Sequence, residues 1–354
     1  MRISAWPGFG IGHENPYTKL LYESVRTPGI EVEDFSLWRA LWRRYDIFHA
    51  HWPEYYLVHP NKLKALVGTL GMLLCICWLR LRGTKVVWTV HNLRSHNQPR
   101  PRLERLYWRL FPRLVDGFFA LTPGGVAQAR DHFPRLRRLP GFVVPIGTYV
   151  HAYPAGVTRE AARRRLGIGL HQPVFLFLGV IARYKNVPAL ALAFRRLPDP
   201  EAQLVIAGKF DSDNEESATR DAAAGDPRIH IHSGYVPANE LQVFFNAADV
   251  VVLPFLEILN SASAMLALAF ERPVLVPALG AMPELQKTFG PDWVRTYEGD
   301  LTLEELQAAL EWSRRLGKPN LKYAAAFQWA EIGRKTLEAY RAVLREPGAM
   351  PLTP

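Results

Sequence analysis

The chain has 354 residues, of which 49% are apolar, so it is long enough to form two domains with large cores. Its net charge of +10 comes from the first half, where residues 1–150 carry 21 Lys plus Arg against 10 Asp plus Glu. The two cysteines, Cys75 and Cys77, share one apolar run and join no distant segments, which excludes a disulfide framework and indicates a reducing compartment.

Strands and helices alternate through the first half, and this order predicts a parallel sheet. A helix is expected from about Tyr17. The segment Ala65–Leu79 is apolar over 15 residues, fewer than the ~20 that a membrane-spanning helix needs. We expect a buried helix here, rather than an interfacial membrane helix. The predicted strands are Arg2–Trp6, Asp46–His51, Lys85–His91, Gly117–Leu121 and Gly141–Pro145.

Six arginines fall between Arg94 and Arg113, interleaved with leucine and aromatic residues. A basic, aromatic-rich amphipathic segment suits an anionic membrane surface or a phosphorylated lipid. Nucleic acid is the competing partner for this charge. The sequence contains no recognisable nucleic-acid-binding motif, so we expect a membrane surface and no nucleic acid.

A second alternating series begins at Pro173 and predicts a second α/β domain. We expect domains at residues 1–155 and 156–329, with a C-terminal helix at about 330–346 that packs back on the first. Two such domains in tandem imply a cleft, with ligands at the carboxyl ends of the strands. The predicted strands are Val174–Ile181, Gln203–Ala207, Ile229–His232 and Val250–Leu253, and the predicted helices are Arg159–Leu166, Asn186–Arg196, Asn239–Asn246, Leu303–Arg315 and Ala330–Arg345.

The stretch Val250–Pro277 is the most informative part of the chain. It is typical of a buried strand, a polar loop, an apolar helix and a second buried strand. A helix start among small polar residues offers free backbone N–H groups and the positive end of a dipole to a phosphate. The alternative is an ordinary crossover with a plain N-cap. The loop residues concerned are Glu257, Asn260, Ser261 and Ala262.

A basic loop follows the first strand of the second half. It runs from Gly179 and contains Arg183, Tyr184 and Lys185. A diphosphate leaving group needs positive charge where negative charge develops, so this loop is a candidate for that role. The alternative is a solvent-exposed basic turn. The run Asp211-Ser212-Asp213 resembles a metal-binding pattern, but it stands in a polar stretch that we interpret as a solvated loop.

Matching pieces from near the N-terminus to about residue 300 give the chain a family resemblance. They are Asn15-Pro16-Tyr17, Tyr45-Asp46 through His49-x-His51-Trp52-Pro53-Glu54, His91-Asn92 with His96, Tyr184-Lys185, Val252-Leu253-Pro254 with Asn260-Ser261, Arg272-Pro273-Val274-Leu275, and Gly290-Pro291-x-Trp293-Val294 with Tyr297-Glu298-Gly299. These pieces make the chain similar to the GT-B glycosyltransferases and, more specifically, to the xanthan-pathway GDP-mannose β-mannosyltransferases.

This resemblance implies a GT-B fold of two Rossmann-like domains and an inverting, metal-independent transfer. The donor would be a nucleotide sugar, GDP-mannose, and the acceptor a lipid-linked oligosaccharide at the cytoplasmic face of the inner membrane. No cofactor is expected. Tyr235-Val236 stand where related proteins hold the nucleotide base, although core packing of Tyr235 is an alternative.

An inverting transfer needs one general base for the acceptor hydroxyl. Glu54 is the leading candidate because it follows a strand beside His51 and Trp52, whose partial burial of the carboxyl would raise its pKa. His51, His91 and His13 are alternates, since histidine titrates near working pH. The expected acceptor contacts lie in the first domain: His13, Asn15, Tyr17, Trp52, Asn92 and His96.

Two departures from related patterns matter. Many retaining GT-B enzymes carry two glutamates eight positions apart, and here Met265 stands where the partner of Glu257 is expected. Ala262 replaces a glycine of the xanthan-type loop. The alternatives that remain open are a retaining or UDP-sugar-dependent hexosyltransferase, a non-catalytic partner protein on the same scaffold, and a nucleic-acid-binding protein.

Overall fold

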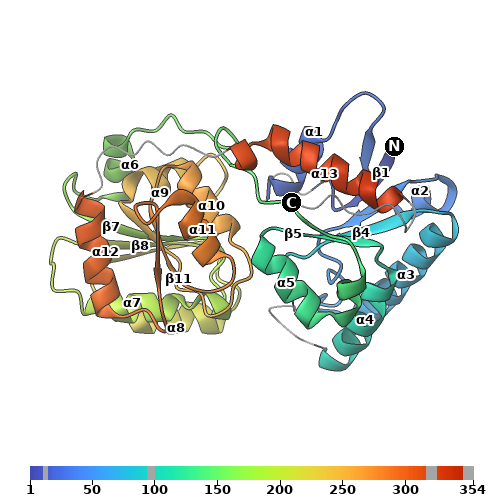
Figure 1. Ribbon diagram of the computed structural model, residues 1–354. Helices are drawn as coiled ribbons and strands as arrows, with labels where there is room; N and C mark the ends of the chain where they lie inside the picture. Colours follow the sequence, from blue (N-terminus) through green and yellow to red (C-terminus); the bar gives the residue numbers. More distant parts are fainter. Residues whose placement is uncertain (11–14, 94–99, 316–324, 346–354) are drawn as a thin grey trace. The chain divides into compact units, whose positions relative to one another are not determined.

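The computed structural model describes residues 1–10, 15–93, 100–315 and 325–345. The chain divides into two compact units, Met1–Gly147 with Ala324–Pro354, and Thr148–Tyr323. The first boundary therefore lies eight residues before the expected position 155. Each unit is built around one six-stranded parallel sheet, with helices beside it (Figure 1). The fold class predicted from the sequence, two α/β domains with parallel sheets, is confirmed.

Unit 1 has the strand order β2-β1-β3-β4-β5-β6. The chain leaves β1 towards β2 on one side and returns to β3 on the other, so a topological switch point lies between β1 and β3. The strands are β1 Arg2–Trp6, β2 Glu31–Asp34, β3 Ile47–Ala50, β4 Lys85–Thr89, β5 Gly117–Ala120 and β6 Gly141–Val143.

Helices cover both faces of this sheet (Figure 1). The C-terminal helix α13 packs beside α1, while α3 and α4 pack side by side and α2 contacts α3. Close approach of α13 to α1 requires a glycine, because a β-carbon on Gly333 would collide with the backbone of Ser24. The helices are α1 Tyr17–Ser24, α2 Leu37–Trp42, α3 Lys62–Leu81, α4 Pro101–Leu114, α5 Pro123–His132, the 3-10 helix η1 Pro134–Arg138, the 3-10 helix η3 Ala325–Phe327 and α13 Trp329–Leu344.

Unit 2 has the strand order β12-β11-β10-β7-β8-β9, which places its switch point between β7 and β10. Its strands are β7 Val174–Leu178, β8 Gln203–Gly208, β9 Ile229–Ser233, β10 Val250–Val252, β11 Val274–Pro277 and β12 Val294–Tyr297. Its helices are α6 Arg159–Leu166, the 3-10 helix η2 Arg183–Lys185, α7 Val187–Arg195, α8 Asp213–Ala223, α9 Leu241–Ala247, α10 Ala262–Ala269, α11 Met282–Phe289 and α12 Leu303–Arg315.

Two expectations about local structure are wrong. The stretch around Asp213 is not a solvated loop but the start of α8, whose N-cap Ser212 accepts a hydrogen bond from the amide of Glu215. The segment Ala65–Leu79 is not a buried helix. It belongs to the 20-residue α3, which buries one side and leaves an apolar side exposed.

Candidate active site

In unit 1, the loops that follow β3 and β4 bring five of the predicted residues together. The His91 ring stacks on Trp52, with centroids 4.5 Å apart, and its Nε2 lies 3.2 Å from Nδ1 of His51. The Asn92 side chain hydrogen-bonds the carboxyl of Glu54, which is the predicted base. These side chains therefore form one cluster at the carboxyl ends of adjacent strands.

Two more predicted residues belong to the start of α1. Tyr17 packs its ring edge-on against His91, with centroids 5.2 Å apart. Asn15 orders this turn, because its Oδ1 accepts a hydrogen bond from the amide of Tyr17 at 3.0 Å. The predicted residues His13 and His96 lie outside the described residues.

Glu54 is half-buried beside the switch point of the first sheet. Burial raises its pKa from 4.5 to about 7, and the nearby carboxylate of Glu104 acts in the same direction. The hydrogen bond from Asn92 opposes this rise. A carboxyl group with a pKa near 7 is well matched to accept a proton at neutral pH.

The histidines of this cluster do not behave as the titratable alternates that the sequence suggested. Burial lowers the pKa of His91 to about 3 and that of His51 well below its usual range. Both rings are therefore neutral at physiological pH. A neutral ring that resists protonation is suited to hydrogen bonding, and it is a poor base for the proton of the acceptor hydroxyl. Among the candidate bases that the structure describes, Glu54 has the pKa that suits the task.

Sequence reasoning missed the buried support behind His51. The hydroxyl of Tyr22 lies 2.6 Å from Nε2 of His51 and 3.0 Å from Nδ1 of His49. Tyr340, on α13, adds a hydroxyl 2.6 Å from the same Nδ1 of His49. The spacing His49-x-His51 could have indicated two side chains on one side of the chain, whereas Tyr340 lies 291 residues away from His49 and gave no local signal.

In unit 2, the loops after β7 and β10 lie on either side of the switch point. They are joined directly, because the amide of Leu256 donates a hydrogen bond to the carbonyl of Tyr184 at 2.8 Å. Ser261 caps α10, its Oγ accepting from the amide of Ala264 at 3.0 Å, and Ala262 is exposed in the first turn. This arrangement puts a helix N-terminus beside the basic loop.

Lys185 is the central charge of this unit. It is only 8% exposed, and burial lowers its pKa from 10.5 to about 8. Its Nζ lies within 6.0 Å of the ring centroids of Phe177, Tyr184 and Phe255. No carboxylate of the described residues lies within ion-pair distance of it. A buried ammonium group without a carboxylate partner is suited to bind an anion.

Gly179 lies next to the ammonium group of Lys185. It has a φ of +142°, and a β-carbon at this position would stand 3.2 Å from Nζ of Lys185 and 4.0 Å from Oγ of Ser263. The two polar loops thus converge over one glycine. Asn260 lies in the same connection, between Leu259, whose carbonyl accepts from the amide of Ala281, and the cap residue of α10.

The other predicted donor residues lie at the margin of this cluster. Arg183 and Glu257 are exposed. Tyr235 and Val236 follow β9, the edge strand, with β8 between them and β7. Tyr235 is 62% exposed, so the alternative that it packs in the core is wrong. The geometry therefore gathers Gly179, Tyr184, Lys185 and the start of α10, and leaves the remaining four residues around them.

Comparison with known proteins then identifies the chain. It is 30% identical over 336 residues to the GDP-mannose:glycolipid 4-beta-D-mannosyltransferase of Xanthomonas campestris pv. campestris, covering 94% of this chain and 90% of that protein. The family model of the glycosyl transferases group 1 matches residues 158–290. The chain belongs to this glycosyltransferase family.

Other relatives agree with the family and the fold. A D-inositol 3-phosphate glycosyltransferase of Corynebacterium aurimucosum is 26% identical to this glycosyltransferase, with 96% of this chain and 80% of the relative covered. The sucrose-phosphate synthase structure from Thermosynechococcus elongatus superimposes with a TM-score of 0.65 at 18% identity, covering 97% of this chain and 95% of that one. The fold is GT-B, as the sequence resemblance implied.

Proposed function

We propose that this glycosyltransferase transfers mannose from GDP-mannose, with inversion to a β-linkage, onto a lipid-linked oligosaccharide in exopolysaccharide synthesis. We place the reaction at the cytoplasmic face of the inner membrane. The observation that carries the proposal is the similarity to the Xanthomonas protein, whose name specifies GDP-mannose, a glycolipid acceptor and a β-mannosyl product. That similarity extends over both units of the chain.

Unit 2 is the proposed donor-binding unit. The pyrophosphate would rest on the ammonium group of Lys185 and on the free amides that begin α10 after Ser261. Both groups are fixed before the reaction, so they stabilise the charge that develops as the bond between sugar and diphosphate breaks. In this role they supply the positive charge without a metal cofactor. Activity in the presence of EDTA tests that part of the proposal.

Unit 1 is the proposed acceptor-binding unit, with Glu54 as general base. The carboxylate of Glu54 takes the proton of the acceptor hydroxyl while the acceptor oxygen forms a bond to C1 of the sugar. The bond between C1 and the diphosphate oxygen breaks in the same step, and GDP leaves. Trp52 and His91 form a stacked pair of aromatic rings at 4.5 Å beside this carboxyl, a surface suited to the apolar face of a sugar.

Met265 supports an inverting reaction. In the retaining pattern a second glutamate stands eight positions after Glu257, whereas here Met265 is a core residue of α10, 3% exposed. The position therefore supplies packing to the helix and no carboxylate to a sugar.

A thermal-shift panel of nucleotide sugars tests the donor. GDP-mannose should stabilise the fold by ~2.7 kcal/mol at a hundredfold excess over its dissociation constant. The anomeric configuration of the product, measured by proton NMR coupling, tests inversion. Stabilisation by UDP-sugars alone would mean that the donor is a UDP-sugar, and an α-linked product would mean that the transfer does not invert the anomeric configuration. Binding without turnover would favour a non-catalytic partner protein.

A further inference from the structure

Unit 1 exposes an apolar face that the proposed chemistry does not use. Along α3, six of the seven exposed large apolar residues recur every three or four positions, which places them on one side of the helix, and the seventh, Leu66, adjoins Val67. Leu74 is 70% exposed and Leu81 83%. At 1.5 Å per residue the 20-residue helix extends this stripe over about 30 Å. The stripe consists of Leu63, Val67, Leu70, Leu74, Trp78 and Leu81.

Helix α2 widens the same face. It contacts α3, and two of its tryptophans are exposed, Trp38 by 70% and Trp42 by 69%. Arg82 ties the two helices together, since its guanidinium donates to the carbonyls of Leu41 and Trp42 and lies over the ring of Trp78 at 5.5 Å. We call the exposed apolar side chains of α2 and α3 the apolar face.

The neighbouring helix α4 supplies positive charge. Its arginines Arg102, Arg105, Arg109 and Arg113 are all exposed, and none of them forms an ion pair within the described part of the chain. Helices α2 and α3 contain no acidic residue, and the one acid of α4, Glu104, is buried and accepts a hydrogen bond from the indole of Trp108.

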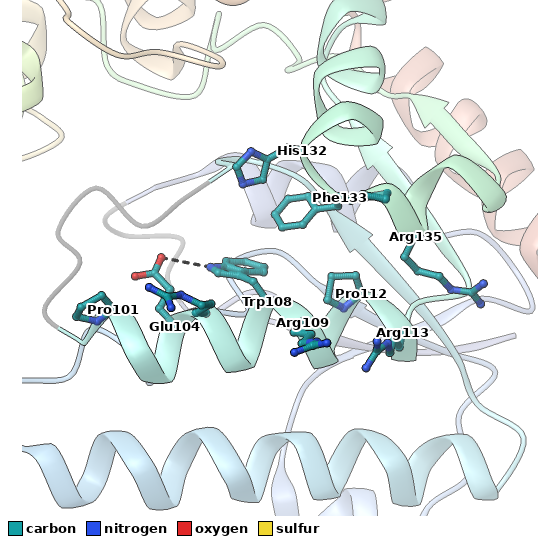
Figure 2. A pocket seen from close by; sticks show the side chains of 11 residues that line it. Pro101, Glu104, Trp108, Arg109, Pro112, Arg113, His132, Phe133 and Arg135 are labelled. Atoms are coloured by element: carbon teal, nitrogen blue, oxygen red, sulfur yellow. Dashed lines mark hydrogen bonds between the residues drawn. The ribbon is translucent and has the colours of Figure 1, made fainter.

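A groove of about 720 Å³ lies between α4 and η1 (Figure 2). Trp108, Phe133 and Pro112 give it apolar walls. Arg105, Arg109 and Arg135 line it as well, as does Glu104, whose carboxylate is engaged by the indole of Trp108. Such a groove combines contacts for an acyl chain with cations for a phosphate.

We propose that the apolar face and the arginines of α4 dock this enzyme onto an anionic phospholipid bilayer, with α3 lying in the plane of the interface. Charge complementarity favours an anionic bilayer as the partner, because the three helices α2, α3 and α4 expose tryptophan, leucine and arginine side chains and no carboxylate. This surface differs from the one expected from the sequence, in which the arginine-rich segment alone contacted the membrane.

Helix α3 is the one helix among the described residues that is long and apolar enough to cross a membrane. Its other side, however, belongs to the core of unit 1, where Ile76 and Leu79 are buried. Arg80 fixes this side further by donating to the carbonyl of Leu114 and pairing with Asp116. A helix held in this way meets the membrane along its exposed side, as an interfacial helix does.

The apolar face is connected to the proposed general base. A β-carbon on Gly68 of α3 would collide with the ring of Tyr56, so the loop that carries Glu54 packs directly on this helix. Arg100, just before α4, holds the same loop by donating to the carbonyls of Leu57 and Pro60. The proposal deepens the proposed function and, for its link to the acceptor, rests on it: docking would bring a lipid-linked acceptor next to Glu54.

Co-sedimentation of the full chain with vesicles tests the docking. The wild type should bind vesicles of phosphatidylcholine with phosphatidylglycerol, more weakly those of phosphatidylcholine alone, and less in high salt. Leu70→Ser with Leu74→Ser should lower partitioning about tenfold on both vesicles. Arg105→Gln with Arg109→Gln should remove the preference for the anionic vesicle.

Matched controls separate docking from folding and from function. Leu192→Ser, at a half-exposed leucine of α7, and Arg164→Gln, at an exposed arginine of α6, should leave binding unchanged. Circular dichroism melting shows whether each variant folds, and the nucleotide-sugar thermal shift without vesicles reports the donor function separately. A wash with alkaline carbonate should release the protein from the vesicles, because it does not span them.

Three results would overturn the proposal. They are no binding of the wild type to either vesicle, equal binding of folded Leu70→Ser/Leu74→Ser protein, and a wild-type dimer in sedimentation that the same pair of substitutions converts to a monomer. In the last case a second copy of the chain would cover the apolar face. Failure of every nucleotide sugar to shift the melting temperature would reject the proposed function and leave the vesicle result standing.

Discussion

Gly208, at the end of β8, passes so close to Gly179 that a β-carbon on Gly208 would collide with the carbonyl oxygen of Gly179. Both glycines have positive φ, +149° and +142°. The contact fixes the distance between the loop after β7 and the end of β8, and the loop after β7 leads directly to Lys185. The position of the buried ammonium group of Lys185 therefore depends on Gly208, a residue that has no polar side chain.

Gly208→Ala should displace this loop and destabilise unit 2 by ~2–4 kcal/mol, because a methyl group replaces a backbone contact at an unfavourable φ. Chemical denaturation measures the loss, and the donor thermal shift measures the effect on binding. Gly225→Ala is the matched control, since Gly225 also has a positive φ (+71°) but open space around it. Equal losses in the two variants would show that strain alone, and not the contact, matters.

Lys185→Met should stabilise the free protein and abolish donor binding. The pKa of Lys185 falls from 10.5 to about 8 on folding, so the charged form is penalised at neutral pH and an apolar side chain of similar length relieves that penalty. We expect a gain of ~1–3 kcal/mol at pH 7. In the wild type, stability should rise between pH 8 and 10.5, and Lys185→Met should lose this rise. Lys209→Met, at an exposed lysine, should change neither property.

Glu54→Gln should reduce kcat by about a hundredfold or more, because an amide cannot take the acceptor proton. The wild-type rate should rise with pH through about 7, where Glu54 loses its proton. Stability moves in the opposite direction: since folding raises this pKa from 4.5, wild-type stability falls as pH rises from 4.5 to 7, and Glu54→Gln should remove that fall. Glu298→Gln, at an exposed glutamate, is the control.

Glu104→Gln should move the acid limb of the rate profile to lower pH. The charge of Glu104 raises the pKa of Glu54, and removing it makes Glu54 easier to ionise. An initial-rate profile between pH 5 and 9 is the measurement. A limb that stays in place would mean that Glu54 does not limit the rate. His91→Asn, in contrast, should leave the limb near pH 7 because His91 is neutral throughout this range.

Tyr340→Phe should destabilise unit 1 by ~0.5–1.5 kcal/mol through loss of the hydrogen bond to His49. The remaining hydroxyl near Nδ1 of His49 belongs to Tyr22, so this nitrogen keeps one partner, and Nε2 keeps the hydroxyl of Thr89 at 2.7 Å. Urea denaturation measures the change. Tyr235→Phe, at an exposed tyrosine, should be neutral, and an equal loss in both variants would argue against the contribution of α13 to the His49 cluster.

Much of the fold was predictable from periodicity. β1 was predicted with both ends correct, and so were α6 and α12, because apolar spacing and capping residues marked them. The alternation of strands and helices predicted a parallel sheet in each unit, although the edge strands β2 and β12 were not among the predicted strands. The helix α8 was missed because its sequence is mostly polar, although Ser212 and Glu215 form the capping-box spacing that could have found it. The exposed stripe of α3 was missed because an apolar run looks the same whether protein or lipid covers one side.

The candidate site was predictable where it is built from loops that follow strands. Glu54, His91 and Lys185 all stand at such positions, where parallel sheets place functional groups. Sequence spacing gave no information on how deeply each side chain is buried. Burial is what makes Glu54 a base suited to neutral pH and keeps His51 and His91 neutral. It also encloses Lys185, which has no carboxylate partner in the part of the chain that the structure describes.

The place of α13 has a consequence for biosynthesis. Unit 2 is one continuous segment, Thr148–Tyr323, whereas unit 1 also includes α13, which follows unit 2 in the chain and buries its Ile332 and Tyr340. During translation the N-terminal strands therefore emerge first but wait for the last helix, while the second unit can already fold. Unit 1 can therefore be completed only after the whole of unit 2 has been synthesised, and a released chain truncated before Trp329 should keep the second unit but leave the first without the helix that packs on α1.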